Sequence, residues 1–188
     1  MLKFEKLEVN GKKIQSPANQ LWRPPPENFY KINIDGAYDP NTRTGEWGFV
    51  VRDSNGEVLL VGAGKISRAA SAIQIEGIAA LKAIQRAAQL GMTRIILETD
   101  ASVLVSALRS IDIDRSAHGC LVRQIQDLMQ MHFSCCSLSL CNRSCNKVAN
   151  LLATYGASIL ASDPEMYTSQ VPEFVKELVS GDLSGGDA

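Results

Sequence analysis

Three acidic side chains stand at positions where a carboxylate is costly to place. Asp35 ends the apolar run "KINI", Glu76 lies in the otherwise uncharged run of residues 69–81, and Asp100 directly follows the run "RIILET". Burying a carboxylate is unfavourable unless another group compensates its charge. Each acid alone has a structural explanation, namely an Asp-Gly turn, a solvated helix face and a helix N-cap, respectively. Together, the three acids suggest one shared site.

Such a site would need a cation. Carboxylates within a few ångströms of one another repel, and hard divalent cations neutralise that repulsion. Ligands that are all oxygen favour Mg²⁺ or Mn²⁺ over zinc. Two such ions about 4 Å apart can hydrolyse a phosphodiester, one activating the attacking water and the other stabilising the leaving oxygen. The acids therefore predict metal-dependent nuclease chemistry, provided that the fold brings them together.

The first half of the chain predicts three strands. They cover residues 30–38, 45–53 and 57–66, and the pair Asn55-Gly56 marks a turn between the second and the third. Short connections of this kind are typical of an antiparallel meander.

The second half alternates helices and strands. We expect helices at residues 71–90, after Asp100, at 117–132 and at 146–160, with strands at 94–99 and 134–141. A meander followed by such alternation predicts an α/β fold with a five-stranded mixed sheet flanked by helices. If the first and fourth strands are parallel neighbours, their ends bring Asp35 and Asp100 together. A helix packed over that pair can add Glu76.

One domain with two extensions accounts for the length of 188 residues. Residues 1–28 are predicted to be an extended, proline-containing lead-in, residues 29–162 the folded domain, and residues 163–188 a tail with a short helix before a disordered end. We expect Trp22 to pack on the domain surface.

Composition narrows the functional classes. The chain has 19 basic and 20 acidic residues, so charge alone does not predict tight nucleic-acid binding. There is no signal-peptide pattern and no long apolar run, which predicts an intracellular protein of the nucleus or cytoplasm that is neither secreted nor bound to a membrane. Four of the five cysteines fall within residues 135–145 without the spacing of a zinc site, so we expect reduced, packed thiols.

Five segments resemble the ribonuclease H-like domain family, in particular its members that are abundant in plants and related to retroelement polyproteins. These segments are "WRPPPENFYKINIDGAY", "GFVVRDSNGEVL", "IEGIAALKAI", "ILETDASVLVSAL" and "NRSCNKVANLLA". They follow the order and approximate spacing of the family over about residues 22–161.

The resemblance implies a Mg²⁺-dependent endonuclease with two ions that cuts the RNA strand of an RNA–DNA hybrid. Asp35 would bridge both ions, and Glu76 and Asp100 would hold the ion on the leaving-group side. The predicted contacts with nucleic acid are Gly36, Ser71, Gln74, Arg143 and Asn146.

Two departures from the family pattern weaken this expectation. Asn150 stands where active members carry a fourth acid, so it would be at best a weak metal ligand through its carbonyl oxygen. Ala72 and Ile73 replace asparagines that active relatives use to read the minor groove of the hybrid. Two hypotheses therefore follow from the sequence. One is a weak ribonuclease for RNA–DNA hybrids, and the other is a catalytically inactive module that binds nucleic acid or a protein partner.

Overall fold

The computed structural model describes residues 21–110, 117–159 and 165–184. The predictions for residues 1–20 and for the end of the chain lie outside this part. The elements, in chain order, are β1 (Tyr30–Asp39), β2 (Thr44–Arg52), β3 (Val58–Ile66), α1 (Ala72–Gln89), β4 (Arg94–Thr99), α2 (Ser102–Arg109), α3 (Ala117–His132), β5 (Cys135–Leu140), a 3₁₀ turn (Arg143–Cys145), α4 (Lys147–Gly156), β6 (Glu165–Thr168) and α5 (Glu173–Ser184).

One mixed sheet forms the centre of the molecule, in the strand order β5-β4-β1-β2-β3-β6. The first three strands pair antiparallel, while β1 pairs parallel to β4 and β4 pairs parallel to β5. The predicted α/β fold with a mixed sheet flanked by helices is confirmed. The predicted strand number was wrong by one, because β6 from the C-terminal segment adds to the edge of β3. A strand of only four residues has too weak a pattern to stand out in the sequence.

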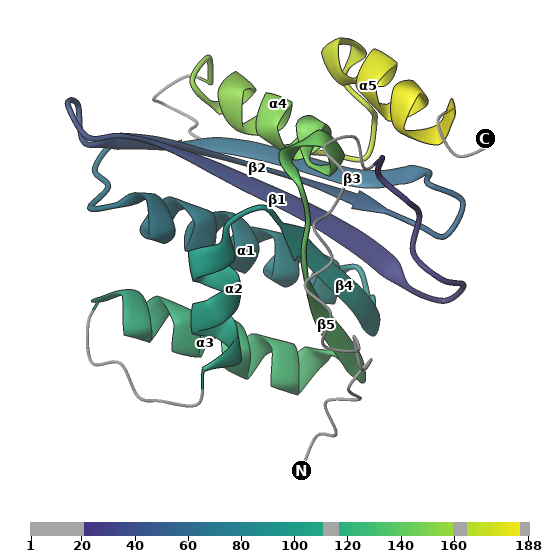
Figure 1. Cartoon of the computed structure of the whole chain (residues 1–188), viewed down its shortest axis with the longest axis horizontal. Helices are drawn as coiled ribbons and strands as arrows, with labels where there is room; N and C mark the ends of the chain where they lie inside the picture. Colours follow the sequence, from purple (N-terminus) through teal and green to yellow (C-terminus); the bar gives the residue numbers. More distant parts are fainter. Residues whose placement is uncertain (1–20, 111–116, 160–164, 185–188) are drawn as a thin grey trace.

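The helices lie in two layers, one on each face of the sheet. Helices α1, α2 and α3 cover one face, and α4 and α5 cover the other (Figure 1). The larger apolar core lies under α1 and includes Ile32, Ile34 and Trp47. The smaller core lies under α4 and α5 and includes Leu152 and Val175. None of the helices within the described ranges is long and apolar enough to cross a lipid bilayer.

Close backbone contact fixes α4 on the sheet. A Cβ atom added to Gly48 of β2 would lie 2.3 Å from the backbone nitrogen of Ala153 and 2.7 Å from the carbonyl oxygen of Ala149. Backbone atoms cannot rotate away from such a contact, so only glycine lets the helix approach this closely. This contact sets the distance between α4 and β2.

Gly48→Ala should therefore destabilise the protein by about 1–3 kcal/mol, because overpacking forces α4 away from the sheet. Urea unfolding measures this change. Gly181→Ala in α5 is a matched control, because nothing lies within 4 Å of its added Cβ. That control should be neutral or stabilising by up to about 1 kcal/mol, since alanine favours helix over glycine. Equal effects of the two substitutions would contradict the packing argument.

Candidate active site

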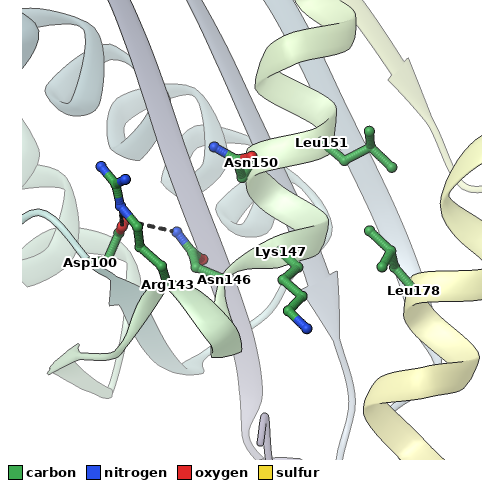
Figure 2. A pocket seen from close by; sticks show the side chains of 7 residues that line it. All are labelled: Asp100, Arg143, Asn146, Lys147, Asn150, Leu151 and Leu178. Carbon is green, nitrogen blue, oxygen red and sulfur yellow. Dashed lines mark hydrogen bonds and ion pairs between the residues drawn. The ribbon is translucent and has the colours of Figure 1, made fainter. Parts of the chain in front are cut away.

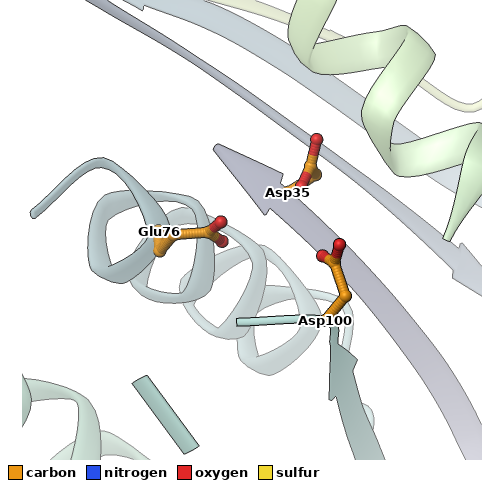
Figure 3. A group of neighbouring side chains, drawn as sticks. All are labelled: Asp35, Glu76 and Asp100. Carbon is orange, nitrogen blue, oxygen red and sulfur yellow. The ribbon is translucent and has the colours of Figure 1, made fainter. Parts of the chain in front are cut away.

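The parallel pairing of β1 and β4 brings the two aspartates together. Asn33 of β1 is in register with Glu98 of β4. Asp35 and Asp100 each follow two residues later, so they leave the same edge of the sheet side by side (Figure 3). Helix α2 has Ala101 as its N-cap residue and no side-chain cap. The helix-cap explanation for Asp100 is therefore wrong, and its carboxylate is directed at the site instead.

Helix α1 supplies the third acid. Its N-cap is Ser71, and Glu76 lies near its first turn, next to the middle of β1. The helix comes close because a Cβ on Gly36 would lie only 2.9 Å from the backbone nitrogen of Glu76. The missing side chain of Gly36 thus faces α1, which gives this glycine a packing role. Its predicted contact with nucleic acid stays a prediction.

The three carboxylates form one cluster. One oxygen from each of Asp35, Glu76 and Asp100 lies within 4.8 Å of the others, the only group of this kind found in the described part of the chain. Burial, followed by the charges of the other two acids, raises the pKa of Glu76 to about 8. Burial also raises the pKa of Asp35 to about 6, with Asp100 adding to the shift and a hydrogen bond from Asn150 countering it.

An unpartnered oxygen shows that this cluster suits a cation. Within the described residues, Oε2 of Glu76 is buried and has no hydrogen-bond partner. Leaving a buried acceptor unsatisfied costs free energy. A hard divalent cation among oxygen ligands would satisfy this atom and remove the repulsion together. The three acids therefore fit a hard divalent cation.

In the absence of divalent cations, the stability of the protein should fall as the pH rises from about 4.5 to about 8. Over this window, folded Glu76 keeps a proton that the unfolded chain releases, because the pKa is raised from 4.5 to about 8. The folded state therefore binds more protons than the unfolded state, and stability decreases with pH. We expect a loss of about 2–5 kcal/mol, at roughly 1.4 kcal/mol per unit of pKa.

Urea unfolding at pH 5 and pH 8 in a chelator measures this loss. Glu76→Gln, which cannot ionise, should remove most of it. A pH dependence that survives this substitution unchanged would assign the effect to other groups.

Asn150, at the position where active family members carry a fourth acid, brings an amide to the site. Nδ2 of Asn150 on α4 donates a hydrogen bond of 2.8 Å to Oδ2 of Asp35. Asn150 thus reaches the site, as the sequence predicted for a fourth ligand, but it turns an N–H toward the aspartate rather than an oxygen toward a cation. It also adds no negative charge.

The 3₁₀ turn and the N-cap residue that precede α4 place two further polar residues against Asp100. Nε of Arg143 lies 3.3 Å from Oδ2 of Asp100, and Nδ2 of Asn146 lies 3.2 Å from its Oδ1 (Figure 2). The Arg143 side chain is 95% exposed, so it remains open to a ligand. Asn146 is only 2% exposed. Its amide already donates to the carbonyl oxygen of Ile34 and to Asp100 within the protein, and its contact with nucleic acid stays a prediction.

An opening of about 310 Å³ lies beside these residues. It runs from Asp100 and Arg143 across the start of α4 to Leu178 of α5 (Figure 2). Helix α5 therefore forms a wall next to the acids; the helical spacing of apolar residues in this segment fits a helix docked on the domain, but it does not indicate which face the helix covers.

The other predicted contacts, Ser71 and Gln74, lie at the start of α1. Oγ of Ser71 is 2.6 Å from Nε2 of His118, and Oε1 of Gln74 accepts a hydrogen bond from the backbone N–H of Ala70. Gln74 also lines a second opening with Arg43 and Arg68. Both residues are on the same side of β1 as Glu76, and their contacts with nucleic acid stay predictions.

The sequence reasoning missed the polar residues that support the acids. Lys31 and Asn33 precede Asp35 at alternate positions of β1, so all three side chains leave the same face of the strand, and all three are buried. Alternation of polar residues in an otherwise apolar strand was the available signal. Trp22, expected on the surface, is 2% exposed and packs into this group.

Comparison with known proteins supplies a family. A family model described as reverse transcriptase-like matches residues 33–156. No curated protein sequence matches the chain.

Several solved structures with the same fold are ribonucleases H. Ribonuclease H1 from the halophilic archaeon Halobacterium salinarum is 23% identical, with a TM-score of 0.64 over 69% of this chain and 98% of that one. The N-terminal ribonuclease H domain of a Mycobacterium tuberculosis protein is 23% identical, with a TM-score of 0.61 over 67% and 91%. The ribonuclease H1 named LC11, isolated from compost, is 16% identical in its complex with an RNA/DNA hybrid, with a TM-score of 0.60 over 66% and 94%.

Proposed function

Since this chain belongs to the reverse transcriptase-like family of ribonuclease H-like domains, we propose that it hydrolyses the RNA strand of RNA–DNA hybrids in a reaction that depends on Mg²⁺ or Mn²⁺. We further propose that the reaction is slow, because Asn150 replaces the fourth acid. The main support for this proposal is the cluster of Asp35, Glu76 and Asp100, in which one oxygen from each lies within 4.8 Å of the others.

The residues at the site have distinct roles in this proposal. Bound divalent cations supply an activated water and stabilise the leaving oxygen. Asp35 is central, since Asn150 reaches it from α4 while the other two acids lie beside it. Asp35 would be shared by two ions, Glu76 and Asp100 would hold one, and the carbonyl oxygen of Asn150 would hold the other after its amide turns over. An amide gives that second ion no charge compensation, so its binding should be weak.

The choice of substrate is supported by the fold and by the surface near the acids. The ribonuclease H1 that shares this fold at a TM-score of 0.60 was solved with an RNA/DNA hybrid. In this chain, the exposed guanidinium of Arg143 beside Asp100 is suited to a backbone phosphate. Ser71 and Gln74 can offer polar contacts at the start of α1 on the other side of the acids.

A second candidate is a module without catalysis that binds nucleic acid or a protein partner. It is favoured by the hydrogen bond from Asn150 to Asp35, which joins these side chains without an ion. The net charge of −1 gives this candidate no general attraction to nucleic acid.

The deciding experiment is cleavage of an RNA–DNA hybrid with labelled RNA, in Mg²⁺ and separately in Mn²⁺. Single-stranded RNA, double-stranded RNA and double-stranded DNA are the control substrates. We expect slow cleavage of the RNA strand of the hybrid alone, faster in Mn²⁺ and abolished by chelator. Absence of cleavage in either ion, with hybrid binding that weakens steeply with salt, would support the nucleic-acid module instead. A protein complex that survives raised salt and Asp35→Asn would support the partner alternative.

A further inference from the structure

A chain of buried polar side chains connects both ends of the described protein to Asp100. It runs on the α4 side of β1 through Arg52, Asn33 and Asn146. Asn33 and Arg52 are fully buried, and Asn146 is 2% exposed. Buried polar groups need partners, so each link restricts the next.

Donors fix the orientation of the Asn33 amide. Its Oδ1 accepts from Nε1 of Trp22 at 2.9 Å and from Nη2 of Arg52 at 3.1 Å. Indole and guanidinium groups can only donate, so the oxygen of Asn33 must face them. The Nδ2 group therefore points the other way, donating to Oε1 of Glu98 at 2.9 Å and to Oδ1 of Asn146 at 3.3 Å.

The same logic orients the next amide. Because Asn146 presents its oxygen to Asn33, its Nδ2 is turned to the carbonyl oxygen of Ile34 at 2.8 Å and to Oδ1 of Asp100 at 3.2 Å. If this amide turned over, an oxygen would face the Asp100 carboxylate and repel it. The rotamer of Asp100 is thus tied to the orientation of Asn33.

Arg52 is held by residues that flank the matched region 33–156. The guanidinium carbon of Arg52 lies 3.5 Å from the centroid of the Trp22 ring. Nη1 of Arg52 lies 2.7 Å from Oδ2 of Asp182 on α5. Asp182 is 9% exposed. Burial lowers the pKa of Arg52, and Asp182 and Glu98 act against this shift by stabilising the cation. A buried arginine without such a carboxylate is strongly unfavourable.

We propose that Arg52 is a positioning residue for Asp100, and that Trp22 and Asp182 hold it in place from outside the matched region. In this arrangement the segment before β1 and helix α5 support the metal site without supplying a ligand to it. Insofar as Asp100 is a metal ligand, the inference rests on the proposed function. Residues in the outer shell of a metal site commonly set the affinity through the ligands that they orient.

The test compares two ways of loosening the C-terminal segment in the full chain. Asp182→Ala removes the partner of Arg52. Lys82→Gln removes the ion pair between Lys82 and Glu165 of β6; among the described residues this pair shares no hydrogen-bond partner with Asn33. Mn²⁺ binding is measured by electron paramagnetic resonance at a temperature where circular dichroism shows both variants folded. Asp182→Asn, which keeps an acceptor for Arg52, serves as the conservative variant.

We expect Asp182→Ala to weaken Mn²⁺ binding about three- to tenfold. Lys82→Gln should change it less than twofold, and Asp182→Asn should lie between. Trp22→Phe keeps the ring on Arg52 but removes the indole N–H, and it should weaken binding by a smaller factor. Equal changes in Asp182→Ala and Lys82→Gln, or no change in either, would overturn the inference.

A second readout separates this inference from the proposed function. Exchange of the Asn146 side-chain amide protons with solvent, followed by nuclear magnetic resonance without metal, should accelerate in Asp182→Ala and not in Lys82→Gln. If the wild-type protein binds no Mn²⁺, the proposed function fails, and the amide exchange alone decides the positioning role. Unchanged exchange in Asp182→Ala would refute that role.

Discussion

Asp35→Asn should slow cleavage of the RNA–DNA hybrid about a thousandfold and weaken Mn²⁺ binding by about a hundredfold or more. Asp35 lies between Asn150 and the other two acids, so it is the ligand that any ion at this site would use. Unit charges about 4 Å apart interact by roughly 4 kcal/mol at an effective dielectric constant near 20. At about 1.4 kcal/mol for each factor of ten, the rate should fall by about a thousandfold.

The fold should tolerate this change, because the substitution also removes charge repulsion from a buried cluster. Urea unfolding without metal should show Asp35→Asn to be at least as stable as the wild-type protein at pH 8. Asp127→Asn makes the same chemical change on the exposed face of α3 and should alter neither cleavage nor Mn²⁺ binding. Cleavage that persists in Asp35→Asn would place the activity elsewhere or in a contaminating nuclease.

Asn150→Asp should raise hybrid cleavage in Mg²⁺ at least about tenfold and tighten divalent-ion binding by a similar factor. The side chain already reaches Asp35, with 2.8 Å between Nδ2 and Oδ2. A carboxylate there would add a fourth negative charge and two ligand oxygens, which a second hard cation prefers. The same change should destabilise the metal-free protein by about 1–3 kcal/mol, because a hydrogen bond is replaced by repulsion between two carboxylates.

Asn150→Ala separates the two effects of this substitution. It removes the hydrogen bond without adding charge, so it should lower stability slightly and leave cleavage no faster than in the wild-type protein. Initial rates across a Mg²⁺ titration, together with urea unfolding in chelator, measure both effects. If Asn150→Asp and Asn150→Ala have the same rate, the missing charge at this position does not limit catalysis.

Local sequence patterns predicted most of the elements because the relevant interactions are short in range. The strand at residues 94–99 and the helix at 117–132 have the predicted bounds, and the others differ by a few residues at their ends. Strand β6 was missed because its stability comes from pairing with β3 rather than from its own residues. The tail helix α5 owes its place to contacts such as that of Asp182 with Arg52, across 130 residues of sequence.

The sequence likewise predicted only part of the candidate site. The sequence alone indicated which residues can bind a cation, because carboxylate chemistry belongs to the residue type, and because the three acids stand in or beside apolar segments where a charge is costly. The resemblance to ribonuclease H-like domains indicated the missing fourth charge at Asn150. Only the tertiary structure decided that the three acids meet, since their proximity depends on parallel pairing of β1 with β4 and on the close approach of α1 at Gly36.

The buried polar residues that orient Asp100 were also visible only in the tertiary structure. Asn146 looked like a surface contact and is a buried link to Asp100, while Trp22 and Asp182 lie in segments that looked peripheral. Hydrogen-bond direction between buried amides depends on which donors and acceptors surround them, and these come from residues far apart in the chain. Residue type therefore specifies the chemistry that the site can perform, and long-range packing specifies where that chemistry is held.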